Sequence, residues 1–575
     1  MKENCLYQPE EVLDFKHLLE RTTKLYGNKI AFIYKSNPES KNPQYIQKTY
    51  NDFQSDINGL GTKLIDLGLE NKRVAIIAPN RYEWCVSYLA ITTSNIVVVP
   101  LDKSLPDNEI ESLIIRSEVE AIVFDHKYLE ILEKIRVNKS SNLKFYICMD
   151  FPSNSENVLS YLQLIEEGKN LIASGDQRLN NITIDRNKMT SMLFTSGTTS
   201  IAKAVMLSQH NICSNINQIR SIVNIKPENV FLSFLPLHHT FECSCTFLTG
   251  ITCGITIAFC DGLKHVVQNL KEYKVTGFVC VPLMLEAMYK KIMKGIEKAG
   301  KLKLIKIMLP ITNFLARCGI DIRRKVYKEI LDELGGHLDL IIYGAAPMSK
   351  EVIKGLTSFG LRLDQGYGLT ETSPVLCGET DRLKKPGSCG VPLKGVDLKI
   401  INPDENGVGE IIAKGPNIML GYYNNSQATK EALKDGYFYT GDLGYLDKDG
   451  CIFITGRKKS VIVLKNGKNV FPEELENLIN KIPFVSESIV YGKPTKDEDL
   501  ELCAKIVYNE QIIKEIFPEA KKEDYYDIIL KEVKQINKTL PAYKYVRKVT
   551  VTDEPLIKTT TQKVKRHEEI KRILG

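Results

Sequence analysis

Short apolar runs rich in β-branched residues alternate with longer helical segments over the first two thirds of this chain. One set of runs comprises Arg73–Ala78, Asn95–Leu101, Ala121–Asp125 and Phe145–Asp150, and a second set comprises Phe231–Pro236, Ile255–Cys260, Gly277–Pro282 and Leu340–Pro347. Strands that are apolar throughout and are separated by helices form parallel sheets with helices on both faces. The pattern therefore predicts an α/β fold built on parallel sheets.

The pattern changes twice nearer the C-terminus. From Gly378 to Asp449, glycines, turns and shorter alternating strands predict an antiparallel β subdomain. After Gly456, an Asn466-Gly467 turn between two apolar strands predicts a hairpin, and Pro472 marks a helix start. A chain of 575 residues exceeds what one hydrophobic core supports. We expect a large domain over residues 1–456 and a small, mobile α+β domain over residues 457–575.

The charge and composition of the chain limit the classes of partner that we expect it to bind. The net charge of +7 is spread along the chain without a like-charge block, so nucleic acid is not an expected partner. The start lacks the pattern of a signal peptide, and the fourteen cysteines have no disulfide-framework spacing, so we expect a cytoplasmic protein with reduced thiols. The amphipathic, basic segment Leu302–Ile330 could contact a membrane surface, and ordinary packing is the alternative.

The stretch Leu193–Asn211, LFTSGTTSIAKAVMLSQHN, places hydroxyl residues around one glycine ahead of Lys203. Hydroxyl and backbone donors with a lysine suit phosphate oxygens. A Walker A loop needs glycine directly before the lysine and Ser or Thr after it, whereas Ala202 and Ala204 stand here. Common P-loop nucleotidases are therefore disfavoured, and a plain loop stays open as an alternative.

This stretch resembles the phosphate loop of the adenylate-forming (AMP-binding) superfamily, usually TSGTTGxPKGV. Ser200 replaces its second glycine, and Ala202 and Ala204 replace the following Pro and Gly. Further segments in the same order resemble that family's other motifs: LIIYGAAPMS, GYGLTETSP, YTGDLGYLDKDG, GRKKS and EPLIKTTTQKVKR. In the last of these, Thr560 and Gln562 depart from the usual Pro and Gly.

The resemblance implies roles for individual residues in binding ATP and Mg²⁺. The phosphates would be held by Thr195, Ser196, Gly197, Thr198, Thr199 and Lys203, and the adenine by Gly344, Ala345, Ala346, Pro347, Tyr367 and Gly368. Thr370 would contact the α-phosphate, Glu371 would bind the metal, and Asp442 with Arg457 would hold the ribose. Lys459 would be the hinge between the domains, and Lys563 the catalytic lysine.

The segment LPLHHTFECSC holds His238, His239, Cys243 and Cys245, which could suggest a soft-metal site. Adjacent histidines on a strand would point to opposite faces, and no paired Cys-x₂-Cys is present, so metal is disfavoured. By the resemblance, His239 lies at the junction between acyl group and phosphate. The form of this segment looks most like long-chain fatty acyl-CoA synthetases.

Together these features imply an acid–thiol ligase. It would convert a carboxylic acid, expected to be a medium- or long-chain fatty acid, into acyl-AMP with release of pyrophosphate and then pass the acyl group to coenzyme A. Rotation about Lys459 would separate the two steps. We expect the acyl pocket around His239–Gly250 and Val281–Ile292. Two alternatives stay open: loading of an acyl carrier protein, and a non-catalytic acyl or nucleotide sensor.

Overall fold

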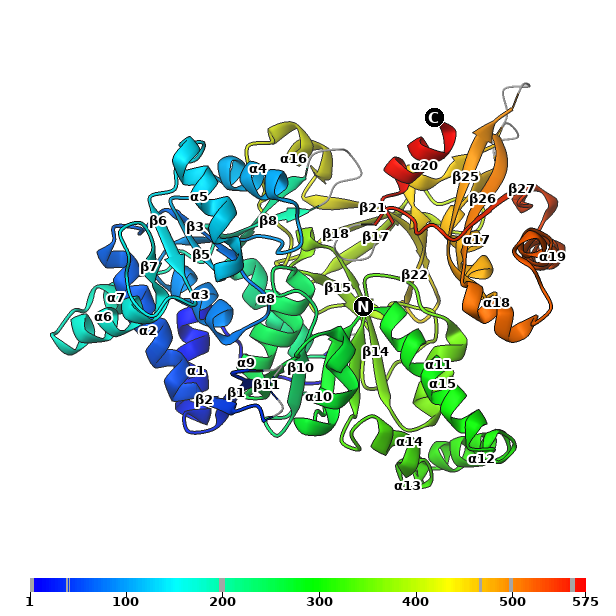
Figure 1. Ribbon diagram of the computed structural model, residues 1–575, viewed down its shortest axis with the longest axis horizontal. Helices are drawn as coiled ribbons and strands as arrows, with labels where there is room; N and C mark the ends of the chain where they lie inside the picture. The colour runs from blue at the N-terminus through cyan, green and yellow to red at the C-terminus, as the bar shows by residue number, and fades with distance from the viewer. Residues whose placement is uncertain are drawn as a thin grey trace.

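The computed structural model describes residues 5–37, 40, 42–195, 202–464, 468–495, 500–558 and 564–575. Figure 1 shows a large body that holds the N-terminal three quarters of the chain, and a smaller C-terminal body beside it at the upper right. Among the described helices, none has both the length and the apolar character needed to cross a bilayer.

The first large sheet has eight strands in the order β19-β9-β8-β4-β3-β5-β6-β7. Its strands are β3 (Arg73–Ile77), β4 (Val97–Pro100), β5 (Ala121–Phe124), β6 (Phe145–Cys148), β7 (Leu159–Ser160), β8 (Met189–Thr195), β9 (Lys203–Ser208) and β19 (Gly421–Tyr422). The predicted apolar runs form its parallel centre, where β3 pairs with β4 and β5.

The second large sheet has nine strands in the order β16-β15-β14-β13-β12-β10-β11-β1-β2. Its strands are β1 (Ile30–Lys35), β2 (Tyr45–Thr49), β10 (Val230–Ser233), β11 (Thr256–Phe259), β12 (Gly277–Cys280), β13 (Leu340–Tyr343), β14 (Arg362–Gly368), β15 (Val375–Gly378) and β16 (Val391–Pro392). The second predicted set of runs supplies its parallel core, β11, β10, β12 and β13.

Both sheets are covered by helices, with one shared core between them. In β3, Val74 and Ile76 belong to the central core, and Ala75 and Ile77 belong to an outer core with α4 and α5. The period of two places successive side chains on opposite faces, so a strand buried on both faces reads as continuously apolar. The helices are α1 (Phe15–Tyr26), α2 (Tyr50–Asp66), α3 (Tyr82–Thr93), α4 (Asp107–Ser117), α5 (Leu129–Asn138), α6 (Tyr161–Ala173), α7 (Arg178–Asn181), α8 (Gln209–Arg220), α9 (Thr249–Cys253), α10 (Val266–Glu272), α11 (Pro282–Lys298), α12 (Leu302–Arg317), α13 (Arg323–Val326), α14 (Lys328–Glu333), α15 (Lys350–Ser358) and α16 (Ser426–Ala432).

The expected antiparallel β subdomain is present as a five-stranded sheet. It consists of β17 (Asp397–Ile401), β18 (Gly409–Lys414), β20 (Leu433–Lys434), β21 (Tyr437–Leu446) and β22 (Ile452–Arg457). Beyond β22, the described residues from 462 to the end pack around cores of their own, and we call this part the C-terminal unit. It contains β23 (Ile462–Val463), β24 (Asn469–Val470), α17 (Pro472–Ile479), β25 (Val485–Pro494), β26 (Leu500–Tyr508), α18 (Glu510–Ile516), α19 (Tyr525–Lys538), β27 (Lys548–Thr552) and α20 (Arg566–Leu574).

The antiparallel pairing of β23 with β24 fits the predicted hairpin, although its Asn466-Gly467 turn lies outside the described residues. Pro472 starts α17 as expected. The domain boundary at residue 457 stays a prediction; β22 ends there, and no strand that follows joins the five-stranded sheet among the described residues.

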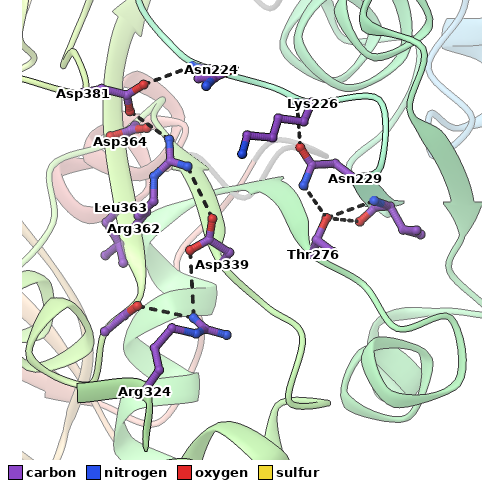
Figure 2. Close-up of polar contacts among 12 residues, drawn as sticks. Asn224, Lys226, Asn229, Thr276, Arg324, Asp339, Arg362, Leu363, Asp364 and Asp381 are labelled. Carbon is purple, nitrogen blue, oxygen red and sulfur yellow. Dashed lines mark hydrogen bonds and ion pairs between the residues drawn. The ribbon is translucent and has the colours of Figure 1, made fainter. Parts of the chain in front are cut away.

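Polar side chains tie together the amino-terminal edge of the nine-stranded sheet, as Figure 2 shows. Arg362, at the start of β14, pairs with Asp339 at 3.3 Å and with Asp381 at 2.8 Å. Thr276, just before β12, accepts a hydrogen bond from the side chain of Asn229, just before β10, at 3.1 Å. These partly exposed pairs hold the starts of neighbouring strands together. The candidate site lies at the opposite, carboxyl-terminal edge of the sheet.

Candidate active site

A cleft of about 2,320 Å³ opens where the carboxyl ends of β13 and β14 face the C-terminal unit. Its walls come from Thr195 and Lys203, residues 344–347 and 367–371, and, across from them, Lys558 and residues 564–568. In open α/β sheets ligands bind at the carboxyl ends of the strands. This is the position at which the sequence motifs converge.

The side chains of Tyr367, Asp442 and Arg457 form one hydrogen-bonded group. The Tyr367 hydroxyl donates to Oδ2 of Asp442 at 2.6 Å, and Nε of Arg457 pairs with Oδ1 at 2.7 Å. Asp442 on β21 and Arg457 on β22 are partners in the strand register, which sets this geometry. Burial holds the pKa of Tyr367 well above its usual range, so its phenol stays protonated and able to donate.

Asp442 lies behind the cleft wall, with only 4% of its surface exposed, while Tyr367 and Arg457 line the cleft. Through its bonds to both residues, the carboxylate holds the Tyr367 ring and the Arg457 guanidinium in place at the cleft wall. The group therefore fits a nucleoside: an aromatic face is fixed by its own hydroxyl, next to a carboxylate and a guanidinium.

The turn after β13 brings residues 344–347 against the end of β14. A Cβ at Gly344 would lie 2.8 Å from the carbonyl oxygen of Gly366, and one at Gly368 would lie 1.8 Å from that of Pro374. Only glycine allows these close approaches. Ala345 takes a left-handed φ of 70°, and residues 345–347 are exposed to the cleft. A flat backbone surface of this kind suits the edge or face of a base.

Glu371 lies beside Thr370 on a short 3₁₀ turn, Thr370–Thr372, within the cleft wall. Its Oε1 accepts a hydrogen bond from the Tyr422 hydroxyl at 2.9 Å. The ammonium of Lys203 lies 4.8 Å from the centroid of the Tyr422 ring. Magnesium binds through one or two carboxylates together with substrate phosphates and water, so a single carboxylate facing the phosphate side fits it.

Tyr422 and Arg116 are site residues that the sequence motifs did not indicate. Tyr422 reaches the cleft because β19 pairs with β9, and Arg116 donates a hydrogen bond to the carbonyl oxygen of Ala202 at 2.5 Å. Both residues line the cleft beside the start of β9. Their partners are distant in sequence, and no local pattern could have revealed them.

The predicted phosphate loop joins β8 to β9. Thr195 and Lys203 are register partners that close the hairpin, and both line the cleft. Ser196, Gly197, Thr198 and Thr199, together with the departure at Ser200, lie outside the described residues. The anchors on both sides of the loop are thus next to Glu371 and Tyr422.

The two histidines do not lie on a strand, contrary to the sequence interpretation. They form a turn that leads directly into a π-helix, Phe241–Leu248, in which all residues after Phe241 are buried. Burial lowers the pKa of His238 to about 4, and its Nε2 lies 3.4 Å from Oδ1 of Asp102. His239 lines the cleft, and its Nδ1 accepts the backbone N–H of Phe241 at 3.3 Å.

The apolar end of the cleft differs in part from the expected acyl pocket. Phe241 and Cys245 line it as predicted, but Leu285 and Met288 of α11 are buried in a neighbouring core. Ile219 in the last turn of α8, and Ile222 and Val223 just after it, line the cleft instead. Their apolar spacing in the sequence is that of an ordinary core helix, which is why it gave no functional signal.

The predicted hinge lies where the two bodies meet. Lys459 is in a short turn, Lys458–Ser460, after β22, and it lines the cleft. Its neighbour Lys458 pairs with Glu410 at 2.7 Å, and Lys294 of α11 pairs with Glu515 of α18 at 3.0 Å. Partly exposed ion pairs of this kind contribute little stability, so they would not strongly resist rotation of one body against the other.

Lys563 lies outside the described residues, but both flanks of its segment are anchored. Lys558 and Val564 form a β-bridge, and both line the cleft. Arg566 holds Glu476 with contacts of 2.6 and 2.7 Å and donates to the carbonyl oxygen of Val490. The base of the segment that carries Lys563 is therefore fixed at the cleft opposite Tyr367.

A buried acid beside the site makes stability depend on pH. Glu242 is fully buried in the π-helix and accepts a bond from Thr246 at 3.0 Å, and burial raises its pKa from 4.5 to about 8. The folded chain therefore keeps a proton that the unfolded chain loses above pH 4.5. The contribution of Glu242 to the free energy of unfolding is greatest below about pH 4.5 and falls by about 1.4 kcal/mol per pH unit until about pH 8.

We expect Glu242→Gln to remove that slope and so to gain stability relative to the native chain as pH rises from 5 to 8. The measurement is the urea midpoint at each pH, followed by the fluorescence of Trp84, the single tryptophan, which is buried in the large body. A difference between the two chains that does not change with pH would contradict the assignment.

Comparison with known proteins agrees with this geometry. The sequence pattern of the AMP-binding enzyme family matches residues 19–423, and that of the AMP-binding enzyme C-terminal domain matches residues 459–573. The long-chain-fatty-acid–[acyl-carrier-protein] ligase AEE15 of Arabidopsis thaliana is 28% identical, over 94% of this chain and 83% of that protein. Fatty acyl-CoA synthetase B of Dictyostelium discoideum is 25% identical, over 98% of this chain and 89% of that protein.

Solved structures show the same fold. ATP-bound MatB from Rhodopseudomonas palustris superposes with a TM-score of 0.73 at 22% identity, covering 98% of this chain and 100% of that one. O-succinylbenzoate coenzyme A synthetase from Bacillus subtilis, in complex with ATP and magnesium, gives 0.72 at 21% identity, covering 96% and 99%. The predicted fold class is thus confirmed, and the chain belongs to the AMP-binding enzyme family of adenylate-forming ligases.

Proposed function

We propose that this chain activates a medium- or long-chain fatty acid as acyl-AMP and transfers the acyl group to coenzyme A. The observation that carries the proposal is the Tyr367–Asp442–Arg457 group, which faces, across one cleft, the anchored base of the Lys563 segment. The relatives named as a long-chain-fatty-acid ligase and as a fatty acyl-CoA synthetase support the class of acid.

A carboxylate must first be converted into a better electrophile. Attack of its oxygen on the α-phosphorus of ATP brings anions together, so catalysis must be largely positional and electrostatic. In the proposal, Lys203 and the phosphate loop hold the β- and γ-phosphates, while Thr370 and Lys563 stabilise charge at the α-phosphate. Glu371 would hold Mg²⁺, which would neutralise phosphate charge when bound.

In the proposal, His239 acts at the junction between acid and phosphate. Its ring lines the cleft, where it would contact the attacking carboxylate or an α-phosphate oxygen. The apolar wall of Ile219, Ile222, Val223 and Phe241 would hold the alkyl chain next to it. Burying an alkyl chain there is favourable by about 0.8 kcal/mol per methylene.

The thiol step requires another arrangement of the C-terminal unit. Coenzyme A must reach the acyl carbon that Lys563 faces during adenylation, and rotation about Lys459 would clear that path. Among the described residues, partly exposed ion pairs between the bodies such as Lys294 with Glu515 are consistent with such a rotation. A cytoplasmic location stays part of the proposal.

A carrier-protein phosphopantetheine is the second candidate acceptor, because one relative is named as an acyl-carrier-protein ligase. The test is pyrophosphate release from ATP across fatty acids of increasing length, followed by thioester yield with coenzyme A and with holo-acyl carrier protein. We expect release that depends on the acid and a higher yield with coenzyme A. Thioester formed only on the carrier would favour the second candidate, and no release with any acid would indicate a non-catalytic sensor.

A further inference from the structure

Helix α12, with the sequence LKLIKIMLPITNFLAR, is apolar on two faces. Its inner face packs in the fold: Ile305 and Thr312 are buried, and Ile305 joins a small core with Tyr327 and Phe359. The outer face carries four large apolar side chains, Leu304, Ile307, Ile311 and Phe314, which are 57%, 62%, 48% and 65% exposed. Packing within the chain therefore explains only one of the two faces.

The exposed residues form a single stripe rather than scattered positions. Their spacing of three, four and three residues places them on one side of a helix. Ile320 and Val326, just beyond α12, add further exposed apolar surface at 57% and 39%. Figure 1 shows α12 at the lower right margin of the molecule, with α13 and α14 beside it. Contiguous apolar surface of this kind on a folded protein marks an interaction site.

Charge indicates what the stripe contacts. Between Glu297 and Asp321 the chain holds five basic residues and no acidic one: Lys298, Lys301, Lys303, Lys306 and Arg317. Lys303 and Lys306 alternate with the stripe residues along the first two turns. An apolar stripe bordered by lysines matches the boundary between acyl chains and anionic headgroups of a bilayer.

We propose that α12 docks this chain on an anionic lipid surface, with the stripe inserted among the acyl chains and the lysines paired with headgroup phosphates. The helix has 16 residues with Pro310 inside it, so it would lie along the surface rather than cross it. A second copy of the chain is a poorer occupant, because a symmetric contact through the stripe would bring the same lysines face to face. The proposal stands on α12 alone and does not depend on the proposed function.

The test is cosedimentation of the full chain with vesicles of phosphatidylcholine, with and without phosphatidylglycerol. We expect stronger binding to the anionic vesicles, weakened by salt, and a loss of at least about tenfold in the partition coefficient for Ile307→Ser with Phe314→Ser. Lys303→Gln with Lys306→Gln should reduce binding to anionic vesicles only. The matched control, Val137→Ser with Leu263→Ser, removes side chains that are 69% and 73% exposed elsewhere and should leave binding unchanged.

Far-ultraviolet circular dichroism and thermal midpoints equal to those of the native chain establish that the variants are folded. Equal binding by the native chain, the stripe variant and the control would overturn the proposal, as would equal affinity for neutral and anionic vesicles. A native dimer that dissociates in the stripe variant, with no vesicle binding by either, would assign the stripe to a second copy instead. Pyrophosphate release is measured separately, so failure of the proposed function does not affect this result.

Discussion

Replacement of Lys563 by alanine should slow formation of acyl-AMP by about 10²- to 10³-fold, equivalent to about 3–4 kcal/mol, the usual effect of removing one donor to a developing charge. Thioester formation from supplied acyl-AMP should persist, because the C-terminal unit would rotate Lys563 away before that step. Burst-phase pyrophosphate release measures the first step, and thioester yield from synthetic acyl-AMP measures the second.

A suitable control is Lys548→Ala, which removes the same charge from the same unit at an exposed pair with Glu501. It should leave both steps unchanged. Equal loss of both steps in Lys563→Ala would contradict the division of labour between two arrangements of the C-terminal unit. Equal loss in the control would show that only overall charge matters.

Asp442→Asn should lower kcat/KM for ATP by about 10²-fold or more, with little change in the KM of the fatty acid. The substitution keeps the volume but removes a charge that holds Arg457 at 2.7 Å and the Tyr367 hydroxyl at 2.6 Å. Hydrogen bonds to a charged group contribute about 1.5–3 kcal/mol each, and the substitution weakens those from both Arg457 and Tyr367. Steady-state kinetics with varied ATP measures the effect.

Tyr367→Phe separates the parts of this group, because it keeps the aromatic face and deletes only the hydroxyl. We expect a smaller loss than for Asp442→Asn, about tenfold. Asp435→Asn is the matched control: Asp435 is exposed in the turn between β20 and β21 and has a φ of 52°, which asparagine tolerates well. Unchanged ATP kinetics in Asp442→Asn would remove that residue from the nucleotide site.

The sheets could be predicted from the sequence because each of their strands is marked by a local run of apolar residues. Runs such as Ala121–Phe124 are apolar at every position, and burial on both faces leaves little other choice. The motif residues Tyr367 and Asp442 could be assigned to one site only through the order of the family's motifs, since their contact spans the β14 and β21 strands.

Other parts of the site depend on long-range packing and could not be predicted. Tyr422 reaches Glu371 through the pairing of β19 with β9, and Ile222 lines the cleft from a helix end that reads as core. His238 and His239, which the prediction against a metal places on a strand, lie in a turn before a π-helix. The roles of Ser196–Thr199 and Lys563 stay predictions.

The transfer of an oxygen atom from the fatty acid to AMP tests activation through an acyl-adenylate most directly. A fatty acid labelled with ¹⁸O in both carboxyl oxygens is incubated with the protein, ATP, Mg²⁺ and coenzyme A, and the nucleotide products are analysed by mass spectrometry. Attack by the carboxylate on the α-phosphorus, followed by attack of the thiol on the acyl carbon, predicts AMP that carries one ¹⁸O. Unlabelled AMP, or label found in inorganic phosphate together with ADP, would contradict activation through an acyl-adenylate in this cleft.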